Sequence, residues 1–288
     1  MAHSPLASPT ATRAVLERHG LHTRKALGQH FLIDDNIIGR ILRLSEIEPG
    51  EPLLEVGPGI GTLTVALLEC GAEVVAVEYD NRLIPVLEEL RATHGRLHIV
   101  HADAVDVAPS RLVTPSGPPR ALIANLPYGV AATVVLRLFE ELPSLERAIV
   151  MVQAEVADRM AASPGSKAYG AYTVKLALRA SAGQRFAVPR TCFQPPPRVD
   201  SAVIRLDRVS RTVSDQLIRA AARAADAAFS QRRKTVRNSL AAGLGVSLVQ
   251  AQEMLAQAGI SPAVRAEEIG IEGFLGLASA LVDQRPVQ

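Results

Sequence analysis

Residues that crosslink chains or bind metals are few in this sequence. It contains two cysteines, Cys70 and Cys192, which lie far apart and have no partner at a spacing typical of metal ligands. The seven histidines show no such spacing either. Because disulfides are atypical of a reducing compartment, we interpret both cysteines as buried thiols. These absences predict a cytoplasmic protein that binds no metal.

Long apolar runs and aromatic residues are also scarce. No stretch approaches the ~20 apolar residues of a membrane span, so we expect no membrane association. The N-terminal residues lack the apolar core of a secretory signal and predict a mobile tail. Aromatic residues make up 3% of the chain, so an aromatic side chain within a motif is a stronger functional candidate. The net charge is only +2, so nucleic-acid binding depends on where the basic residues cluster.

Short apolar runs alternate with helical stretches between residues 52 and 153. The runs are PLLEVG, EVVAVE, LHIVHAD, ALIANLP and RAIVMVQ, which are rich in Val, Ile and Leu. Such runs are typical of strands buried on both faces of a parallel sheet, and strand, helix, strand in repetition predicts a doubly wound α/β fold. Two later runs, QRFAVP and SAVIRLDRV, predict a pair of strands at one edge of the sheet, one of them antiparallel.

The composition of the sequence changes after about residue 210, where alanine-rich helical stretches dominate. In SPAVRAEEI, Ser261 as N-cap and Pro262 at the first helical position predict the start of a helix. We therefore expect two domains. The first, residues 1–210, carries the N-terminal tail and the α/β sheet, and the second, residues 211–288, is small and all-α.

Polar residues follow several of the expected strands, where open α/β sheets bind ligands. The first strand leads into GPGIG, in which Gly57 and Gly59 allow a ligand to approach the backbone at a helix N-terminus. Glu78 ends the second strand at a position suited to ribose hydroxyls, and Asp103 ends the third, within reach of an adenine amine. Asn125 ends the fourth. Each residue alone also fits a tight turn, a solvated strand end or a helix cap, but together they favour a nucleoside cofactor.

The sharpest motif is Asn125-Leu126-Pro127-Tyr128. Methyl transfer to an adenine amine needs the nitrogen lone pair turned out of conjugation, and an amide oxygen and a neighbouring carbonyl that accept the amine hydrogens favour that geometry. The proline fixes the backbone so that the carbonyl before it points inward. Tyr128 offers a flat face on which an extruded base stacks. Phe193 is the candidate for the other face of the base, although a core anchor for its loop explains it nearly as well.

A basic run follows in FSQRRKTVRNSL, residues 229–240, which contains no acidic residue. A solvated helix face is the ordinary explanation of such a run. After a base-modifying domain we favour contacts with RNA phosphates, which position a substrate without reading its sequence. Lys167 and the pair Arg24-Lys25 extend the expected surface. Its four central residues are Arg232, Arg233, Lys234 and Arg237.

These motifs resemble the family of small-subunit rRNA adenine dimethyltransferases. The resemblance covers most of the chain: KALGQHFL, EVGPGIGTLT, NLPY, VQAEVADRM, PGSKAYGAYTV, FQPPPRVDSAV and FSQRRKTVRN. It implies a Rossmann-like class I methyltransferase domain with a mostly parallel seven-stranded sheet, and a helical C-terminal domain that binds RNA or the ribosome. It also implies S-adenosylmethionine as methyl donor, S-adenosylhomocysteine as product, and dimethylation of N6 in two adjacent adenosines of the 3′-terminal hairpin of 16S rRNA. The substrate would be the immature 30S subunit, and we expect the enzyme to act as a monomer.

The resemblance also assigns roles to residues. His30, Leu32, Gly57, Gly59, Glu78, Asp103 and Asn125 fall on cofactor-contacting positions, while Tyr128 and Phe193 fall on positions that sandwich the target adenine. His30 departs from the family, which usually has asparagine there. A histidine can still bond the methionine end of the cofactor, but its charge changes near neutral pH.

Three other classes of protein remain as alternatives. Enzymes of the erythromycin-resistance type methylate 23S rRNA with a similar motif, but PGSKAYG and FSQRRKTVRN argue against that type. A ribosome-assembly or transcription factor that had lost the activity would not need Asn125 and Tyr128. A nicotinamide oxidoreductase would prefer a different glycine spacing at residues 57–61.

Overall fold

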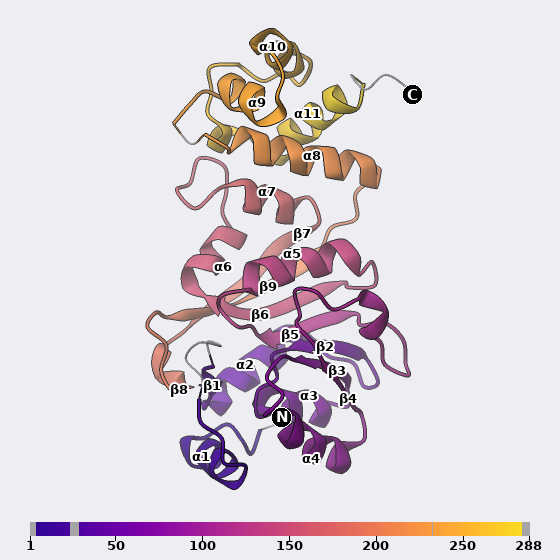
Figure 1. Ribbon diagram of the computed structural model, residues 1–288, viewed down its shortest axis with the longest axis vertical. Helices are drawn as coiled ribbons and strands as arrows, with labels where there is room; N and C mark the ends of the chain where they lie inside the picture. Colours follow the sequence, from indigo (N-terminus) through magenta and orange to yellow (C-terminus); the bar gives the residue numbers. More distant parts are fainter. Residues whose placement is uncertain (1–3, 24–28, 232, 284–288) are drawn as a thin grey trace. The chain divides into compact units, whose positions relative to one another are not determined.

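The computed structural model describes residues 4–23, 29–231 and 233–283 (Figure 1). By their internal contacts these residues divide into two compact units. The first comprises residues up to 157 together with 182–208, and the second comprises 158–181 and the chain from 209 onward. The segment 158–181 therefore belongs with the helices of the second unit. As independently folding domains, the divisions 1–210 and 211–288 stay a prediction.

The first unit is built on a seven-stranded sheet with strand order β4-β3-β2-β5-β6-β9-β7. The first five strands in this order are parallel, and β9 pairs antiparallel with β6. The chain runs outward from β2 through β3 to β4 and then returns to the other side of β2, so the strand order reverses between β2 and β5. The strands are β2 (Pro52–Val56), β3 (Glu73–Glu78), β4 (Leu97–His101), β5 (Ala121–Asn125), β6 (Arg147–Gln153), β7 (Ala180–Val188) and β9 (Ser201–Arg208).

Helices cover both faces of this sheet (Figure 1). One core joins residues of α2 and α3 to side chains from one face, such as Leu53 and Ile123. The alternate residues Leu54 and Leu122 are also fully buried and point to the opposite face, where α5 lies. The helices are α1 (Pro9–Arg18), α2 (Asp35–Ser45), α3 (Thr62–Glu69), α4 (Ile84–His94), α5 (Ala131–Glu141) and α6 (Ala154–Met160), the last of which reaches into the second unit.

A short second sheet ties the N-terminal part of the first unit to the connector after β7. Strand β1 (Phe31–Leu32) pairs antiparallel with β8 (Phe193–Gln194), and a 3-10 turn (Arg190–Cys192) precedes β8. This pairing brings the chain near residue 30 beside the sheet, although it is distant from the connector in sequence. The predicted mostly parallel seven-stranded sheet is confirmed, and so is the pair of strands at one edge, β9 and β7, of which β9 is antiparallel to β6.

Three local expectations were wrong. Part of the expected mobile N-terminal tail forms α1, in which Thr12 and Val15 are buried. The connection between β4 and β5 forms only a 3-10 turn (Pro109–Arg111) where strand, helix, strand predicted an α-helix. Its proline-rich part is held instead by Glu73, whose carboxylate accepts from Thr114 Oγ1 at 2.7 Å and from the Ser116 amide at 2.9 Å. The helix expected from Pro262 is a turn followed by a 3-10 helix (Ala266–Glu268).

The second unit is helical and has its own core. Side chains of α8 and α11 meet in this core, which also contains Tyr169, Val174 and Leu178 from the segment before β7. At Gly243 an added Cβ would lie 2.6 Å from the Cα of Ala227, so α8 and α9 approach more closely than any side chain would allow. The helices are α7 (Ala171–Ala177), α8 (Asp215–Ala228), α9 (Val236–Leu244), α10 (Leu248–Gln257) and α11 (Ile271–Asp283).

Candidate cofactor and base site

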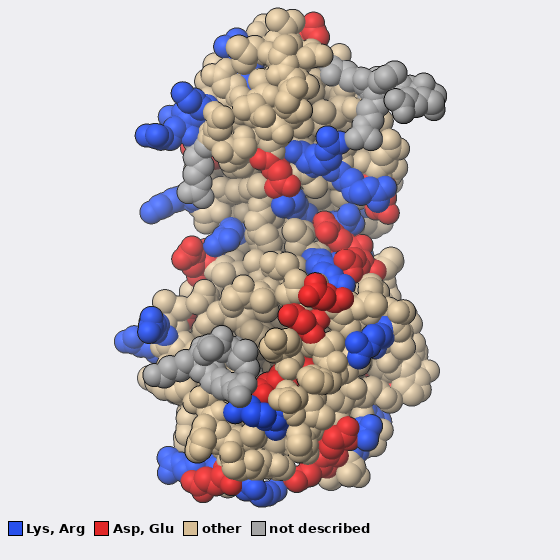
Figure 2. Space-filling view, in the orientation of Figure 1, with Lys and Arg blue, Asp and Glu red and all other residues tan. Residues whose placement is uncertain are grey.

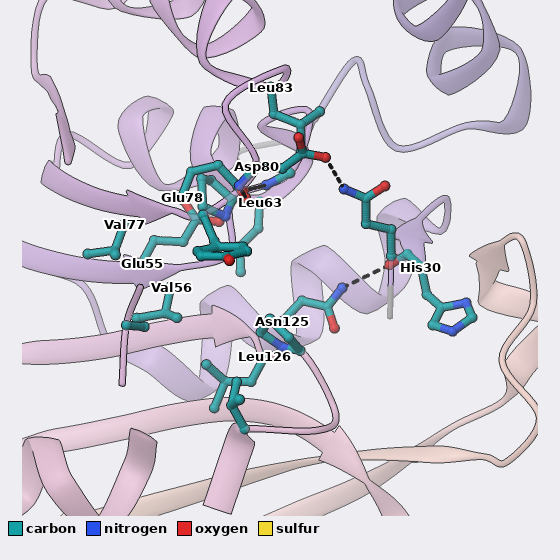
Figure 3. A pocket seen from close by; sticks show the side chains of 18 of the residues that line it. His30, Glu55, Val56, Leu63, Val77, Glu78, Asp80, Leu83, Asn125 and Leu126 are labelled. Atoms are coloured by element: carbon teal, nitrogen blue, oxygen red, sulfur yellow. Dashed lines mark hydrogen bonds between the residues drawn. The ribbon is translucent and has the colours of Figure 1, made fainter. Parts of the chain in front are cut away.

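A cavity of about 510 Å³ lies at the carboxyl ends of β2, β3 and β5 (Figure 3). This is the edge of the sheet at which the strand order reverses, the usual ligand crevice of open α/β sheets. Its volume is within the range of small-molecule sites. The cavity brings together eight of the residues predicted from the sequence: His30, Leu32, Gly57, Gly59, Glu78, Asp103, Asn125 and Tyr128.

The glycine turn after β2 adopts a conformation that side chains rarely reach. Gly57 and Gly59 have φ values of 70° and 62°. An added Cβ on Gly57 would lie 3.2 Å from Pro127 Cδ, and one on Gly59 would lie 3.1 Å from Phe31 Cε1. The turn is therefore packed between the NLPY motif and strand β1. It leads into α3, whose first N–H groups are available to a ligand at the helix N-terminus.

Glu78 is held rigidly at the end of β3. One carboxylate oxygen accepts from the Asp80 amide at 2.8 Å and the other from the Gly59 amide at 3.2 Å. Burial raises the pKa of this carboxyl group above its usual value, although these backbone donors oppose the shift. Each oxygen has a lone pair beyond those used in the protein, so the group can accept from a pair of ribose hydroxyls.

Asp103 is more accessible than Glu78. Its Oδ1 accepts from the Val105 amide at 2.9 Å, which fixes the side chain at the turn after β4. The second carboxylate oxygen is then available for a donor such as an exocyclic adenine amine. This geometry supports the position proposed from the sequence and also explains the residue as the cap of a turn.

Asn125 has a defined amide orientation. Its Nδ2 donates to the carbonyl oxygen of His30 at 3.2 Å (Figure 3), so Oδ1 remains as an acceptor beside the cavity. The next residue, Leu126, is buried and its amide donates to the Met151 carbonyl at 3.1 Å. These bonds fix the start of the motif to the residue before β1 on one side and to β6 on the other.

Tyr128 is half-buried at the wall of the cavity. Its hydroxyl shares a 2.6 Å hydrogen bond with Oγ of the fully buried Ser201, which fixes the plane of the ring. Burial raises the pKa of the phenol above its usual value, which keeps it neutral. A neutral ring whose hydroxyl is satisfied elsewhere serves as a stacking surface and does not act as a base.

His30 and Phe193 occupy different environments. The His30 ring stacks on Tyr128 with centroids 5.6 Å apart and an interplanar angle of 24°. Its Nδ1 is 2.7 Å from the Pro195 carbonyl oxygen, which only accepts, so Nδ1 carries the proton. Phe193 is 2% exposed, pairs with Leu32 and packs in the sheet core, and it is absent from the described lining of the cavity. Its stacking on a base stays a prediction.

Several cavity residues were missed by sequence reasoning. Tyr79 follows Glu78 directly, is 61% exposed and lines the cavity. Asp80 and Gln29 line the same cavity and share a 2.8 Å hydrogen bond. Glu55 also lines it, although it is 1% exposed. A signal existed for Tyr79, because an aromatic residue beside a strand-end acid is conspicuous in a chain this poor in aromatics.

The basic residues predicted to bind RNA lie in the second unit. Arg233 and Lys234 are exposed in the loop between α8 and α9, and neither forms an ion pair with any described residue. Arg237 is the second residue of α9. It is half-buried and donates to Gln252 Oε1 at 3.4 Å. Arg232 lies outside the described residues, as do Arg24 and Lys25. Figure 2 shows Lys and Arg side chains at several places on the surface of this unit.

Hydrogen bonds hold the described residues on either side of position 232. Oγ of the buried Ser239 donates to the Gln231 carbonyl at 3.2 Å, and Oγ of Ser230 donates to the Ala227 carbonyl at 2.7 Å. The amide of Val236 donates to the Val264 carbonyl. The described residues on both sides of position 232 are therefore tied to the helices α8 and α9.

Among the described residues, no group of three or more His, Cys, Asp or Glu side chains is arranged to hold a metal ion. Cys70 and Cys192 are free thiols. None of the helices described above is long and apolar enough to cross a membrane.

The sheet order, the glycine turn and the row of strand-end acids define the class of an S-adenosylmethionine-dependent methyltransferase with a Rossmann-like fold. The family model for ribosomal RNA adenine dimethylase matches residues 20–283. The chain belongs to this family and is an rRNA adenine dimethyltransferase.

Relatives and solved structures agree with this assignment. Ribosomal RNA small subunit methyltransferase A of Rhodococcus opacus is 45% identical over 282 residues, covering 95% of this chain and 94% of that protein. The protein of the same name from Thermobifida fusca is 42% identical, covering 96% of both. The structure of the 23S rRNA methyltransferase ErmE is 28% identical, with a TM-score of 0.66 over 88% of this chain and all of that one. A dimethyladenosine transferase from Plasmodium falciparum, 23% identical with a TM-score of 0.73 over 86% of this chain and 96% of that one, shares the fold.

Proposed function

We propose that this enzyme dimethylates N6 of two adjacent adenosines in the 3′-terminal hairpin of 16S rRNA, within the immature 30S subunit. The observation that carries the chemistry is the orientation of Asn125. Its amide nitrogen donates to the His30 carbonyl oxygen, so its amide oxygen can accept a hydrogen bond from a substrate amine. Support for the small-subunit substrate comes from relatives 38–45% identical that bear the name small subunit methyltransferase A. The enzyme acts as a monomer and without a metal.

The cavity suits the cofactor. S-adenosylmethionine, when bound, supplies a methyl group on a positively charged sulfur and leaves as S-adenosylhomocysteine. Glu78 would accept from its ribose hydroxyls, Asp103 from its adenine amine, and the glycine turn would approach its methionine end together with His30 and Leu32. Tyr79 would add a ring against the adenine. A glycine turn with positive φ values at a helix N-terminus and carboxylates with unused lone pairs are what such a ligand needs.

The base site uses the NLPY motif. Asn125 Oδ1 and the Leu126 carbonyl would accept the two amine hydrogens, which turns the nitrogen lone pair out of the ring system. Tyr128 would stack on one face of the flipped base, worth about 1–3 kcal/mol, and Phe193 on the other after a movement that exposes it. No general base is required before the methyl group arrives, so the contribution of these residues is orientation.

We assign RNA binding to the helical region, residues 211–288, and methyl transfer to residues 1–210. Arg232, Arg233, Lys234 and Arg237 would contact phosphates and position the hairpin. The exposed Lys167 extends the basic character of the same unit. Such contacts carry no sequence information, so selection of the adenosines depends on the shape of the RNA and on the base cavity.

The test is to incubate undermethylated 30S subunits, and separately 50S subunits, with labelled S-adenosylmethionine and to analyse the nucleosides. We expect dimethyladenosine in 16S rRNA of the 30S sample only. Asn125→Ala should lower turnover at least about a hundredfold, whereas the matched variant Asn36→Ala, on the exposed side of α2, should not change it.

Two of the rival functions give distinct results in this assay. Label in the 50S sample would indicate an enzyme of the 23S type. Binding to 30S subunits without label would indicate an assembly factor. Undiminished turnover by Asn125→Ala would refute the proposed role of the amide oxygen.

A further inference from the structure

A short segment outside the seven-stranded sheet forms one wall of the cavity. We call residues 29–32 the strap. It pairs with β8 through β1, and all four of its residues line the cavity together with the glycine turn and Asn125. The strap therefore contacts the site that the strand ends build, although it lies far from most of them in sequence.

The strap is fastened at its first residue. Gln29 Nε2 donates to Asp80 Oδ2 at 2.8 Å, and the Asp80 side chain is 2% exposed (Figure 3). Asp80 is itself held by Arg82, whose Nε and Nη2 donate to its two oxygens at 2.9 and 2.6 Å. The Arg82 hydrogen bonds are the main cause that lowers the pKa of Asp80, to about 2, so the acceptor is a carboxylate at all working pH values.

The next residue of the strap orients Asn125. The His30 carbonyl oxygen accepts from Asn125 Nδ2 at 3.2 Å. This hydrogen bond fixes which side of the amide carries the NH₂ group and which carries the oxygen. If the amide turned over, its NH₂ group would face the amine of the base and both would be donors. The position of one backbone carbonyl on the strap therefore decides whether the cavity presents an acceptor.

We propose that the hydrogen bond between Gln29 and Asp80 positions the strap so that the His30 carbonyl holds Asn125 with its oxygen toward the substrate amine. Gln29 and Asp80 are then positioning residues for methyl transfer. This inference rests on the proposed function, because it assumes that Asn125 Oδ1 accepts from the substrate.

The experiment compares Gln29→Ala with the wild type. The matched control is Gln184→Ala, which removes the same side chain from an exposed position of β7. Turnover on undermethylated 30S subunits, the Kd of S-adenosylmethionine by calorimetry, and the solvent exchange of the Asn125 side-chain amide protons by NMR are measured for each. We expect Gln29→Ala to lower kcat about tenfold, as loss of one oriented hydrogen bond would, and to accelerate exchange of the Asn125 amide protons severalfold. Gln184→Ala should match the wild type in all three.

The exchange measurement separates a positioning role from a structural one. A lower kcat with unchanged exchange at Asn125 would overturn the proposal, because Gln29 would then act by another route. Unchanged kcat and unchanged exchange would overturn it as well. If no protein, wild type included, methylates RNA, the proposed function fails, while faster exchange in Gln29→Ala would still establish the coupling between Gln29 and Asn125.

Discussion

At the scale of the residue, Glu55 is an unusual acid. It is 1% exposed, it accepts from Thr64 Oγ1 at 2.6 Å, and it lies near the carboxylate of Glu78. Burial is the main cause that raises its pKa to about 8, with the Glu78 charge adding to the shift and the Thr64 hydrogen bond opposing it. At neutral pH the folded protein therefore holds a proton on Glu55, whereas the unfolded chain does not.

This proton makes stability depend on pH. Because the folded pKa lies above the unfolded value of 4.5, the contribution of Glu55 is fully present below about pH 4.5. This stabilising contribution is lost as pH rises from about 4.5 toward about 8. Over that range only the folded state is protonated at Glu55, and the loss is about 1.4 kcal/mol per pH unit. Glu55→Gln keeps the shape and an oxygen for Thr64 but cannot ionise. We expect its free energy of unfolding in urea to fall less than that of the wild type between pH 5 and 8.

A matched control for this comparison is Glu253→Gln, an exposed acid on α10 for which the structure describes no ion pair. Its pH profile should follow the wild type. Parallel profiles for Glu55→Gln and the wild type would contradict the buried, protonated state of Glu55.

Other residues show which parts of the site could be predicted from the sequence and which could not. Gly57, Glu78 and Asn125 were predictable, because the carboxyl ends of parallel strands converge wherever the sheet is correctly inferred. The hydrogen bond of Gln29 with Asp80 was not, since it joins segments 51 residues apart through the pairing of β1 with β8. The burial of Phe193 depends on the same long-range pairing, and so it could not be read from its motif.

At the scale of the element, the loop between α8 and α9 carries two described basic residues. Arg233 and Lys234 are exposed there. Replacing both by alanine should weaken RNA binding and reduce the slope of log affinity against log salt by about 1.4–1.8, since each phosphate contact contributes about 0.7–0.9. The affinity for S-adenosylmethionine should not change. Binding isotherms over a range of salt concentrations give the slope.

The control for this loop removes equal charge elsewhere. Arg18 and Arg91 are exposed and pair with glutamates on α4 in the first unit. The double alanine variant of these two arginines should keep the wild-type slope. Equal reduction in both double variants would mean that net charge, and not this loop, governs the binding.

Local signals predicted most elements but failed where tertiary contacts compete. The run after Ser261 has helical caps, yet its Val264 carbonyl accepts from the start of α9 and it forms a 3-10 helix. There Ala266 and Ile269 are buried at a spacing of three, which suits the tighter helix. Most strands between residues 52 and 153 had no such competitor, because β2, β3 and β5 lie inside the sheet and are almost wholly buried, whereas β4 at its edge is only partly buried.

At the scale of the whole molecule, the fold class followed from the alternation of strands and helices, but the membership of residues 158–181 did not. Helix α7 lies between β6 and β7 in the sequence, where an α/β fold would place one more covering helix. Only its contacts with α8 assign it to the helical unit. The compact units of the structure and the domains predicted from the sequence therefore have different limits.

This difference predicts the behaviour of a fragment. Tyr169, Val174 and Leu178 are nearly fully buried in the core of the helical unit, and the Tyr169 hydroxyl donates to the Ile269 carbonyl at 2.8 Å. A fragment of residues 211–288 lacks all three side chains. Burial of each contributes about 1.5–3 kcal/mol to the free energy of unfolding, so their combined loss is comparable to the whole stability of a small domain. We expect this fragment to show no cooperative thermal transition by circular dichroism.

A second fragment makes the cause testable. Joining residues 158–181 to residues 209–288 through a flexible glycine-serine linker in place of β7 to β9 restores the three side chains without restoring the sheet. It should melt cooperatively, and Val174→Asp in this fragment, which places a carboxylate at a fully buried position, should abolish the transition. A cooperative transition of residues 211–288 alone at the same temperature would show that the segment before β7 covers the helical core without being part of it. The folding unit would then begin at residue 211, as the sequence predicted.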